Sequence, residues 1–371
     1  MSPRDKSTDW ARTRSASTTT PQPRSWKRCV RPSVPETRAT ARRPSRWLGA
    51  TAVLIIVLMP VSLVVGTVEI SLGQAWAALA RFDPGVTEHL LIREVRVPRT
   101  LLALLVGAGL GSAGVVMQAL TRNPLAEPGL LGINAGVTLA VAVSIAFLGF
   151  SSLGASQAFG FLGAAVTGAA VHALGGVRHG AGVVRLVLAG AAVNVVLLAT
   201  TRIILVNMDP QLFGRFRTWT VGSLEGRGFD VLAPTALAVV IGVALALALS
   251  GALDASALGQ DLSRSLGVNP TVVLSLSALA VVILCGAVTV AAGPIGFVGL
   301  TAPALGRFIV GLNHRRLIPA TSLLAAALVL LADVAGRTVI PNAEIGVGIM
   351  ISLIGAPTFI AMVRHRRVAQ L

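Results

Sequence analysis

The sequence predicts an all-α protein that crosses a membrane about ten times. Of its 371 residues, 54% are hydrophobic and only 12% are charged, and the mean hydropathy is +0.79. These values lie far outside the range of soluble globular domains. Continuous apolar runs of helical length recur from residue 48 almost to the C-terminus, and about 20 apolar residues cross a bilayer core. The runs do not alternate apolar with polar residues, which argues against a membrane β-barrel.

The chain begins with a basic arm, residues 1–47, that we expect to be disordered in the cytoplasm. The arm holds twelve Lys or Arg against three acids and is rich in Ser, Thr and Pro, so it has little apolar surface to bury. We interpret it as a signal that fixes orientation, with contact to anionic lipid headgroups as the alternative. The pair Arg42-Arg43 is not interpreted as a twin-arginine export signal, because no small-residue cleavage site closes the apolar run that follows.

Charge and turn residues divide the rest of the chain into ten candidate spans. Their approximate ranges are 48–68, 98–118, 129–149, 159–176, 183–205, 230–250, 271–291, 296–312, 317–333 and 345–363. An even number of spans places both termini on one side of the membrane. The basic arm and the RHRR segment at 364–367 predict that this side is the cytoplasm. We therefore predict a multi-pass transmembrane domain over 48–365 and a cytoplasmic tail over 366–371.

Arginines on the predicted outer side depart from the rule that basic residues concentrate on the cytoplasmic side. They are Arg93, Arg96, Arg99, Arg215, Arg217, Arg227 and Arg337. Such arginines require an anionic partner, which is either a lipid headgroup or a protein.

Two proline-containing breaks suggest that the chain contains inverted halves. Residues 114–132 (GVVMQALTRNPLAEPGLLG) and 286–303 (GAVTVAAGPIGFVGLTAP) both join a small-residue helix end to such a break. The first break faces the cytoplasm in the ten-span map and the second faces outward, as in many transporters; chance similarity between two Gly/Ala-rich segments is the alternative. Around Glu127 we expect prolines to separate two helices and glycines to permit close packing, so this acid is assigned to a structural segment near the cytosolic mouth.

The sequence lacks the residues that most chemistry would need. Its two lysines, Lys6 and Lys27, both lie in the arm, so no phosphate-binding P-loop is present. The five histidines have no paired spacing, and Cys29 and Cys285 lie in the arm and in an apolar run. We predict no metal, haem or other cofactor site and no disulfide. Because mid-membrane acids are also scarce, the energy for any transport must come from elsewhere, most simply from a separate subunit.

Seven segments together resemble one family, the membrane permeases of binding-protein-dependent ABC importers for iron-siderophores, haem and vitamin B12. The most specific, residues 93–132, contains the family's Arg-x-Pro-Arg start of the second span and its Asn-Pro-Leu-Ala-x-Pro motif. The others follow in the family's order at 217–226, 258–268, 293–303, 311–319, 329–337 and 355–363. We assign a structural role to the motif residues Asn123, Pro124, Leu125, Ala126, Pro128, Gly129, Gly293, Pro294, Gly296 and Gly299.

The resemblance covers residues 48–365 and implies a fold like that of the vitamin B12 importer permease, with ten helices per chain. It also implies a second permease chain, identical or paralogous, two cytosolic ATPase subunits and an external binding protein or lipoprotein. Two positions depart from the family pattern: Ala304 stands where histidine is frequent and Gly346 where proline is frequent. The resemblance therefore predicts no local gating geometry at these positions.

The resemblance further implies roles for two groups of residues. Arg96, Arg99 and Arg337 match arginines that meet glutamates of the binding protein in the vitamin B12 importer; lipid phosphate, or an internal pair of Asp333 with Arg337 at i,i+4 spacing, is the alternative. The loop 251–269 resembles the family's two short coupling helices, which fit a cleft on the ATPase, with an ordinary solvated loop as the alternative. The residues expected to couple are Ala257, Leu258, Gly259, Asp261, Arg264, Leu266 and Gly267.

The expected function is that of a permease subunit, not an enzyme, in the cytoplasmic membrane. It would pass iron(III)-siderophore-type chelates inward, driven by the separate ATPase. Vitamin B12 or haem is the alternative cargo, and an ion-coupled secondary carrier is the alternative of a different class. We expect contact with membrane lipid and none with nucleic acid.

Overall fold

The computed structural model describes residues 44–66, 68, 70–148, 153–176, 182–340 and 343–365. Most of the predicted basic arm, residues 1–43, and the predicted tail, residues 366–371, lie outside these ranges. The described part of the chain is built from helices and contains no β-strand. This confirms the predicted all-α class.

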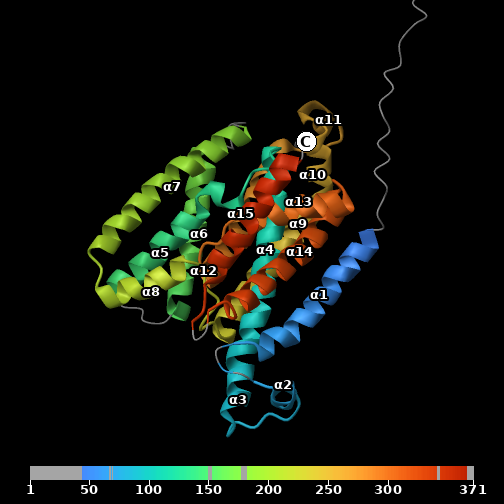
Figure 1. The fold of residues 1–371 in the computed structure, drawn as a ribbon. Helices are drawn as coiled ribbons and strands as arrows, with labels where there is room; N and C mark the ends of the chain where they lie inside the picture. The colour runs from blue at the N-terminus through green and yellow to red at the C-terminus, as the bar shows by residue number, and fades with distance from the viewer. Residues whose placement is uncertain are drawn as a thin grey trace, which may run out of the picture. The chain divides into compact units, whose positions relative to one another are not determined.

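Each of the ten predicted spans corresponds to a helix (Figure 1). Among the described residues, seven helices are long and apolar enough to cross a membrane, and three further apolar helices are shorter. The long helices are α1 (Pro44–Val64), α4 (Val97–Thr121), α6 (Leu153–Leu174), α7 (Val183–Val206), α9 (Phe229–Ala248), α12 (Pro270–Ala292) and α14 (His314–Gly336). The shorter ones are α5 (Ile133–Leu148), α13 (Val298–Val310) and α15 (Val347–His365).

Short helical elements occupy the connections between the spans. They are α2 (Leu72–Ala80), α3 (Thr87–Leu90), the π-helix η1 (Leu91–Arg96), the 3-10 helix η2 (Pro128–Leu131), α8 (Pro210–Thr220), α10 (Ser250–Ala257) and α11 (Gln260–Ser265). Local capping explains two of the starts. Ser71 and Gln74 form a capping box before α2, and the Asp209 side chain accepts a hydrogen bond from the backbone of Gln211 at the start of α8.

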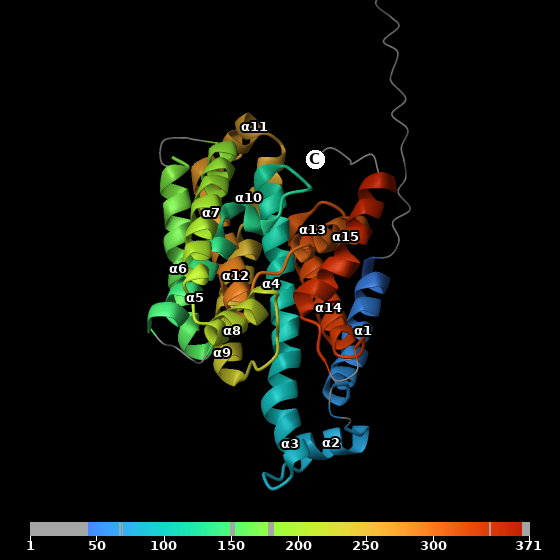
Figure 2. The same ribbon diagram turned by 60° about the vertical axis from the view of Figure 1, so that its left-hand side comes forward.

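The helix α4 runs through the whole transmembrane domain. Figures 1 and 2 show α10 and α11 near one end of α4, and α2 and α3 at the other. We call these the α11 end and the α3 end. Because α3, η1 and α4 follow one another without a break, they form one helical segment, Thr87–Thr121, of 35 residues.

Glycines allow α4 to lie directly against the backbone of α14. A Cβ atom at Gly107 would lie 2.4 Å from the Ala325 carbonyl oxygen, and one at Gly111 would lie 2.8 Å from the Thr321 carbonyl oxygen. Small residues are the usual means of close packing between membrane helices, where no hydrophobic effect drives helices together. The two helices therefore have little freedom to slide past each other.

Candidate functional site

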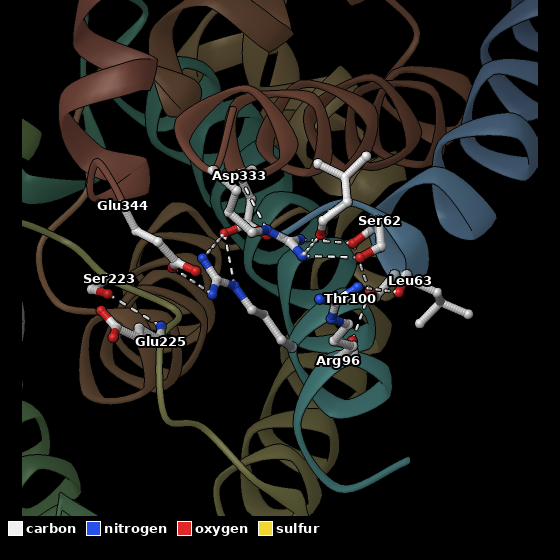
Figure 3. A network of polar contacts seen from close by, with 11 residues as sticks. Ser62, Leu63, Arg96, Thr100, Ser223, Glu225, Asp333 and Glu344 are labelled. Atoms are coloured by element: carbon white, nitrogen blue, oxygen red, sulfur yellow. Dashed lines mark hydrogen bonds and ion pairs between the residues drawn. The ribbon is translucent and has the colours of Figure 1, made fainter. Parts of the chain in front are cut away.

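Arg99 lies at the centre of a buried ionic network at the α3 end. Figure 3 shows its two carboxylate partners, Asp333 and Glu344. Its Nη2 atom is 2.9 Å from Asp333 Oδ1, and its Nη1 atom is 2.7 Å from Glu344 Oε2. The second carboxylate oxygen of Asp333 accepts from Arg337, one helical turn further along α14. Asp333 is 2% exposed. A single buried carboxylate therefore bridges two arginines from different helices.

Two arginines of this network bind the last turn of α1. Arg96 Nη1 donates to the carbonyl oxygens of Leu63 at 2.7 Å and Val64 at 2.6 Å. Arg337 Nη1 donates to the Ser62 carbonyl oxygen at 2.9 Å, and its Nη2 donates to Ser62 Oγ at 2.8 Å. The last carbonyls of a helix lack partners within the helix and carry partial negative charge. The end of α1 thus supplies carbonyl acceptors with partial negative charge in addition to the two carboxylates.

The three arginines that we assigned to docking are thus all bonded within the chain. Arg96, Arg99 and Arg337 are buried, with 5%, 7% and 5% exposure. The alternative that we set beside docking, the internal pair of Asp333 with Arg337, is present in the structure. Docking itself concerns a complex with another protein, and it stays a prediction.

Other arginines of the predicted outer side lie in different environments. Arg93 lies 4.6 Å from the centre of the Phe82 ring, where a cation is attracted by the ring face. Arg217 is exposed. Arg227, in the connection between α8 and α9, is buried, and this burial lowers its pKa to about 10.

The loop 251–269 contains α10 and α11 and presents three leucines to the outside. Leu258, Leu262 and Leu266 are 60%, 50% and 59% exposed. Asp261 and Arg264 are exposed beside them. Gly259 between the helices has a φ of +107°, in the left-handed region that favours glycine. Exposed leucines flanked by charges suit insertion into a groove of a partner protein.

Polar contacts tie α10 to both α4 and α14. Asp254 Oδ1 accepts from the backbone nitrogen of His314 at 3.1 Å and lies 2.5 Å from His314 Nδ1. Arg122 Nη2 donates to the Ser256 carbonyl oxygen at 2.6 Å. His314 is the first residue of α14, and Arg122 is the residue that ends α4. Sequence reasoning missed these contacts, because neither Asp254 nor His314 belongs to a local pattern that would pair them.

The two proline-containing breaks contact each other. Glu127 Oε1 accepts from the backbone nitrogen of Phe297 at 3.0 Å, and Gln118 Nε2 donates to the Gly299 carbonyl oxygen at 3.2 Å. A Cβ atom at Gly299 would lie 2.7 Å from Pro128 Cδ. The two segments that the repeat hypothesis paired therefore lie side by side in the fold.

The family-motif residues lie at the turns of these breaks. In the first break, Asn123 Oδ1 accepts from the Leu125 backbone at 2.9 Å, which closes a tight turn, and Pro128 starts η2. In the second break, Gly293 has a φ of +78° and lies so close to α8 that a Cβ there would be 2.1 Å from the Trp219 carbonyl oxygen. A side chain at Gly293 would be strained for both reasons.

Gly346, a departure from the family pattern, takes part in a similar close approach. A Cβ atom there would lie 2.8 Å from the Gly222 carbonyl oxygen. The same oxygen accepts from the backbone nitrogen of Gly348 at 3.1 Å. The start of α15 thus packs directly on the chain that follows α8.

The chain is similar to known proteins over most of its length. The profile of the FecCD transport family matches residues 54–365. The chain is 41% identical to the ferric enterobactin transport system permease protein FepD of Escherichia coli (strain K12), over 74% of this chain and 82% of that protein. It is 36% identical to the probable siderophore transport system permease protein YfiZ of Bacillus subtilis (strain 168), over 86% and 97%.

Similarity extends to a haem transporter and to a solved structure. The hemin transport system permease protein HmuU of Yersinia pestis is 33% identical, over 88% of this chain and 97% of that protein. A solved structure described as an inward-facing conformation of a metal-chelate type ABC transporter superposes with a TM-score of 0.77 at 29% identity. It covers 87% of this chain and 100% of its own.

The network predicts which carboxylate matters most for stability. Asp333→Asn should lower the free energy of unfolding by about 3–5 kcal/mol, because it leaves two buried arginines with one charged partner fewer. Glu344→Gln should cost less, because Glu344 is 18% exposed and bonds only one arginine. Thermal unfolding of the purified protein in detergent measures both effects. Glu94→Gln, at an exposed acid of η1, is the control, and equal losses for all three variants would contradict the prediction.

Proposed function

The chain belongs to the FecCD transport family, and we propose that it is the permease subunit of an ABC importer for iron(III)-siderophore-type chelates. The observation that supports this choice of cargo is the 41% identity to a permease named for ferric enterobactin transport. Haem is a second candidate, because a hemin transport permease is 33% identical over nearly its whole length. Membership of this family favours an ABC permease over an ion-coupled secondary carrier, and over an enzyme.

We further propose the assembly that such a permease requires. A second permease chain, two cytosolic ATPase subunits and an external binding protein would complete the importer. The chain would lie in the cytoplasmic membrane with its α11 end and both termini on the cytoplasmic side. This orientation is supported by the basic residues of the N-terminal arm and of the 364–367 segment.

In this proposal α10 and α11 receive the movement of the ATPase. Their exposed leucines offer an apolar contact, and Asp254 and Ser256 join α10 to the ends of α14 and α4. Because α4 and α14 are packed through glycine, a displacement of α10 would move both helices together. The same helices carry Arg99 and Asp333 at the α3 end, so the movement would reach the side that faces the binding protein.

We propose that the arginine network also takes part in docking, with one exchange of partners. Arg99 bonds Glu344, which is the more exposed of its two carboxylates. A glutamate of the binding protein could replace Glu344 on Arg99 while Asp333 stays in place. Bidentate arginine would then orient the acidic group as well as attract it.

The cargo proposal predicts selective uptake. A deletion strain that expresses this chain with its partner ATPase and binding protein should accumulate 55Fe supplied as a catecholate, hydroxamate or citrate chelate. Uptake should stop when the ATPase carries an inactive P-loop, because this chain has no P-loop of its own. If the strain accumulates haem or vitamin B12 but no ferric chelate, the cargo proposal is wrong. Uptake that survives ATPase inactivation would contradict the ABC mechanism.

The coupling proposal predicts that Asp254→Ala separates hydrolysis from transport. The variant loses both contacts with His314, so ATP hydrolysis in proteoliposomes should continue while 55Fe-chelate uptake falls by about tenfold, as for a lost charged hydrogen bond. Deletion of Ala257 to Ser265 should abolish uptake. Arg315→Gln, at an exposed residue next to His314, is the matched control. Normal uptake per ATP hydrolysed by Asp254→Ala would refute this route.

The docking proposal predicts opposite effects of two substitutions. Arg99→Glu should weaken the affinity of the binding protein at low salt by about tenfold or more, because it reverses the charge at the contact. Glu344→Gln should leave the affinity unchanged or raise it, because it removes the internal competitor. Binding is measured on nanodisc-embedded complexes whose thermal unfolding midpoint is also recorded. Unchanged affinity for a folded Arg99→Glu variant at low salt would exclude docking through this residue.

A further inference from the structure

Two residues of the breaks adopt an unusual backbone conformation. Among the described residues, the non-glycine residues with positive φ are Arg122, at +50°, and Phe297, at +64°. Arg122 follows the end of α4, where a left-handed residue is common. Phe297 instead precedes the start of α13, where the residue before a helix is normally extended. Left-handed conformation is unfavourable for a residue with a Cβ atom, so other groups must hold Phe297 in place.

The carboxylate of Glu127 is the side chain that holds this turn, in addition to a backbone hydrogen bond from the Val298 nitrogen to the Gly296 carbonyl oxygen at 2.8 Å. Its Oε1 atom accepts from the Phe297 backbone nitrogen at 3.0 Å. The carboxylate thereby lies at the N-terminus of α13, where the helix dipole favours negative charge. None of the ion pairs found in the described part of the chain includes Glu127. Its bond to Phe297 is therefore the contact through which this acid acts on the second break.

The helix α15 packs against the other side of the same turn. A Cβ atom at Gly355 would lie 2.9 Å from Phe297 Cβ. Gly296, one residue before Phe297, lines a hollow of about 430 Å³ together with Gly348 and Ser352 of α15. A Cβ at Gly296 would be 3.4 Å from Glu127 Oε1. The turn at 296–297 thus lies between the Glu127 carboxylate and α15.

We propose that Glu127 is a positioning residue of the transport cycle. Its carboxylate holds the left-handed turn at Phe297 and so joins the break after α4 to α13 and α15. The same break begins at Arg122, which is bonded to α10 through the Ser256 carbonyl oxygen. A displacement of α10 is therefore passed through the first break to the second by the Glu127 bond, which acts beside the bond from Gln118 to the Gly299 carbonyl oxygen. This inference rests on the proposed transport function only because chelate uptake is one of the measurements that test it.

The test separates the backbone role of Glu127 from a role of its charge. Glu127→Leu removes the acceptor, and 55Fe-chelate uptake should fall by about tenfold or more, the effect of losing a hydrogen bond to a charged group. Glu127→Gln keeps an oxygen acceptor and should stay within about threefold of wild type. Adding Phe297→Gly to Glu127→Leu should restore uptake, because glycine adopts the left-handed turn without help. Adding Phe297→Ala is the matched control, which removes the ring but not the strain, and should restore nothing.

The four variants are compared in proteoliposomes with the partner ATPase, using the ferric chelate that the wild-type chain imports. The amount of each variant in the membrane and its thermal midpoint are measured in parallel, and rescue of these values by glycine but not alanine counts equally for the proposal. Equal rescue by glycine and alanine, no rescue by either, or a Glu127→Gln defect as large as that of Glu127→Leu would overturn it. A wild-type chain that imports no chelate would contradict the proposed function instead, and the protein yield and thermal midpoint would still decide the role of Glu127.

Discussion

In an apolar environment, every backbone polar group that a helix leaves free at its end needs a partner within the protein. Several unusual side chains of this chain meet that requirement. Arg96 and Arg337 bond the last carbonyls of α1, and Glu127 bonds the nitrogen at the start of α13. A helix that ends in water needs no such partners, because water supplies them. Helix ends that lie against the protein thus explain why charged residues occur at these positions in so apolar a chain.

The same requirement decides how the charges of the network are arranged. The network holds three arginines and two carboxylates, Asp333 and Glu344. Arg96 donates to backbone carbonyl oxygens rather than to a carboxylate, so the carboxylates alone do not balance the arginines. The carbonyl end of α1 supplies the remaining partial negative charge. Asp333 is essential to this arrangement because it bonds Arg99 of α4 and Arg337 of its own helix at once. The network therefore fastens α1, α4 and α14 to one another at the α3 end.

Features that depend on neighbouring residues could be predicted from the sequence, and features that depend on contacts between distant residues could not. Ten spans could be predicted because hydropathy is a property of consecutive residues, and Asp333 with Arg337 could be considered a pair because they are four residues apart. Arg99 and Asp333 are 234 residues apart, and Glu127 and Phe297 are 170 apart. No periodicity connects such positions. For the same reason an internal partner could be considered from the sequence for Arg337 alone, whereas the fold also supplies acceptors to Arg96 and Arg99.

Two routes lead from α10 into the rest of the domain, and they differ in stiffness. One passes along α4 and α14, where glycines bring the backbones into contact; close-packed helices resist sliding, so this route moves as a unit. The other passes from Arg122 through the first break to Phe297, where the bond from the Phe297 nitrogen to Glu127 and the bond from Gln118 to the Gly299 carbonyl oxygen join the two breaks. A left-handed turn that is held by hydrogen bonds is easier to rearrange than a close-packed helix pair. The first route is therefore the stiffer of the two.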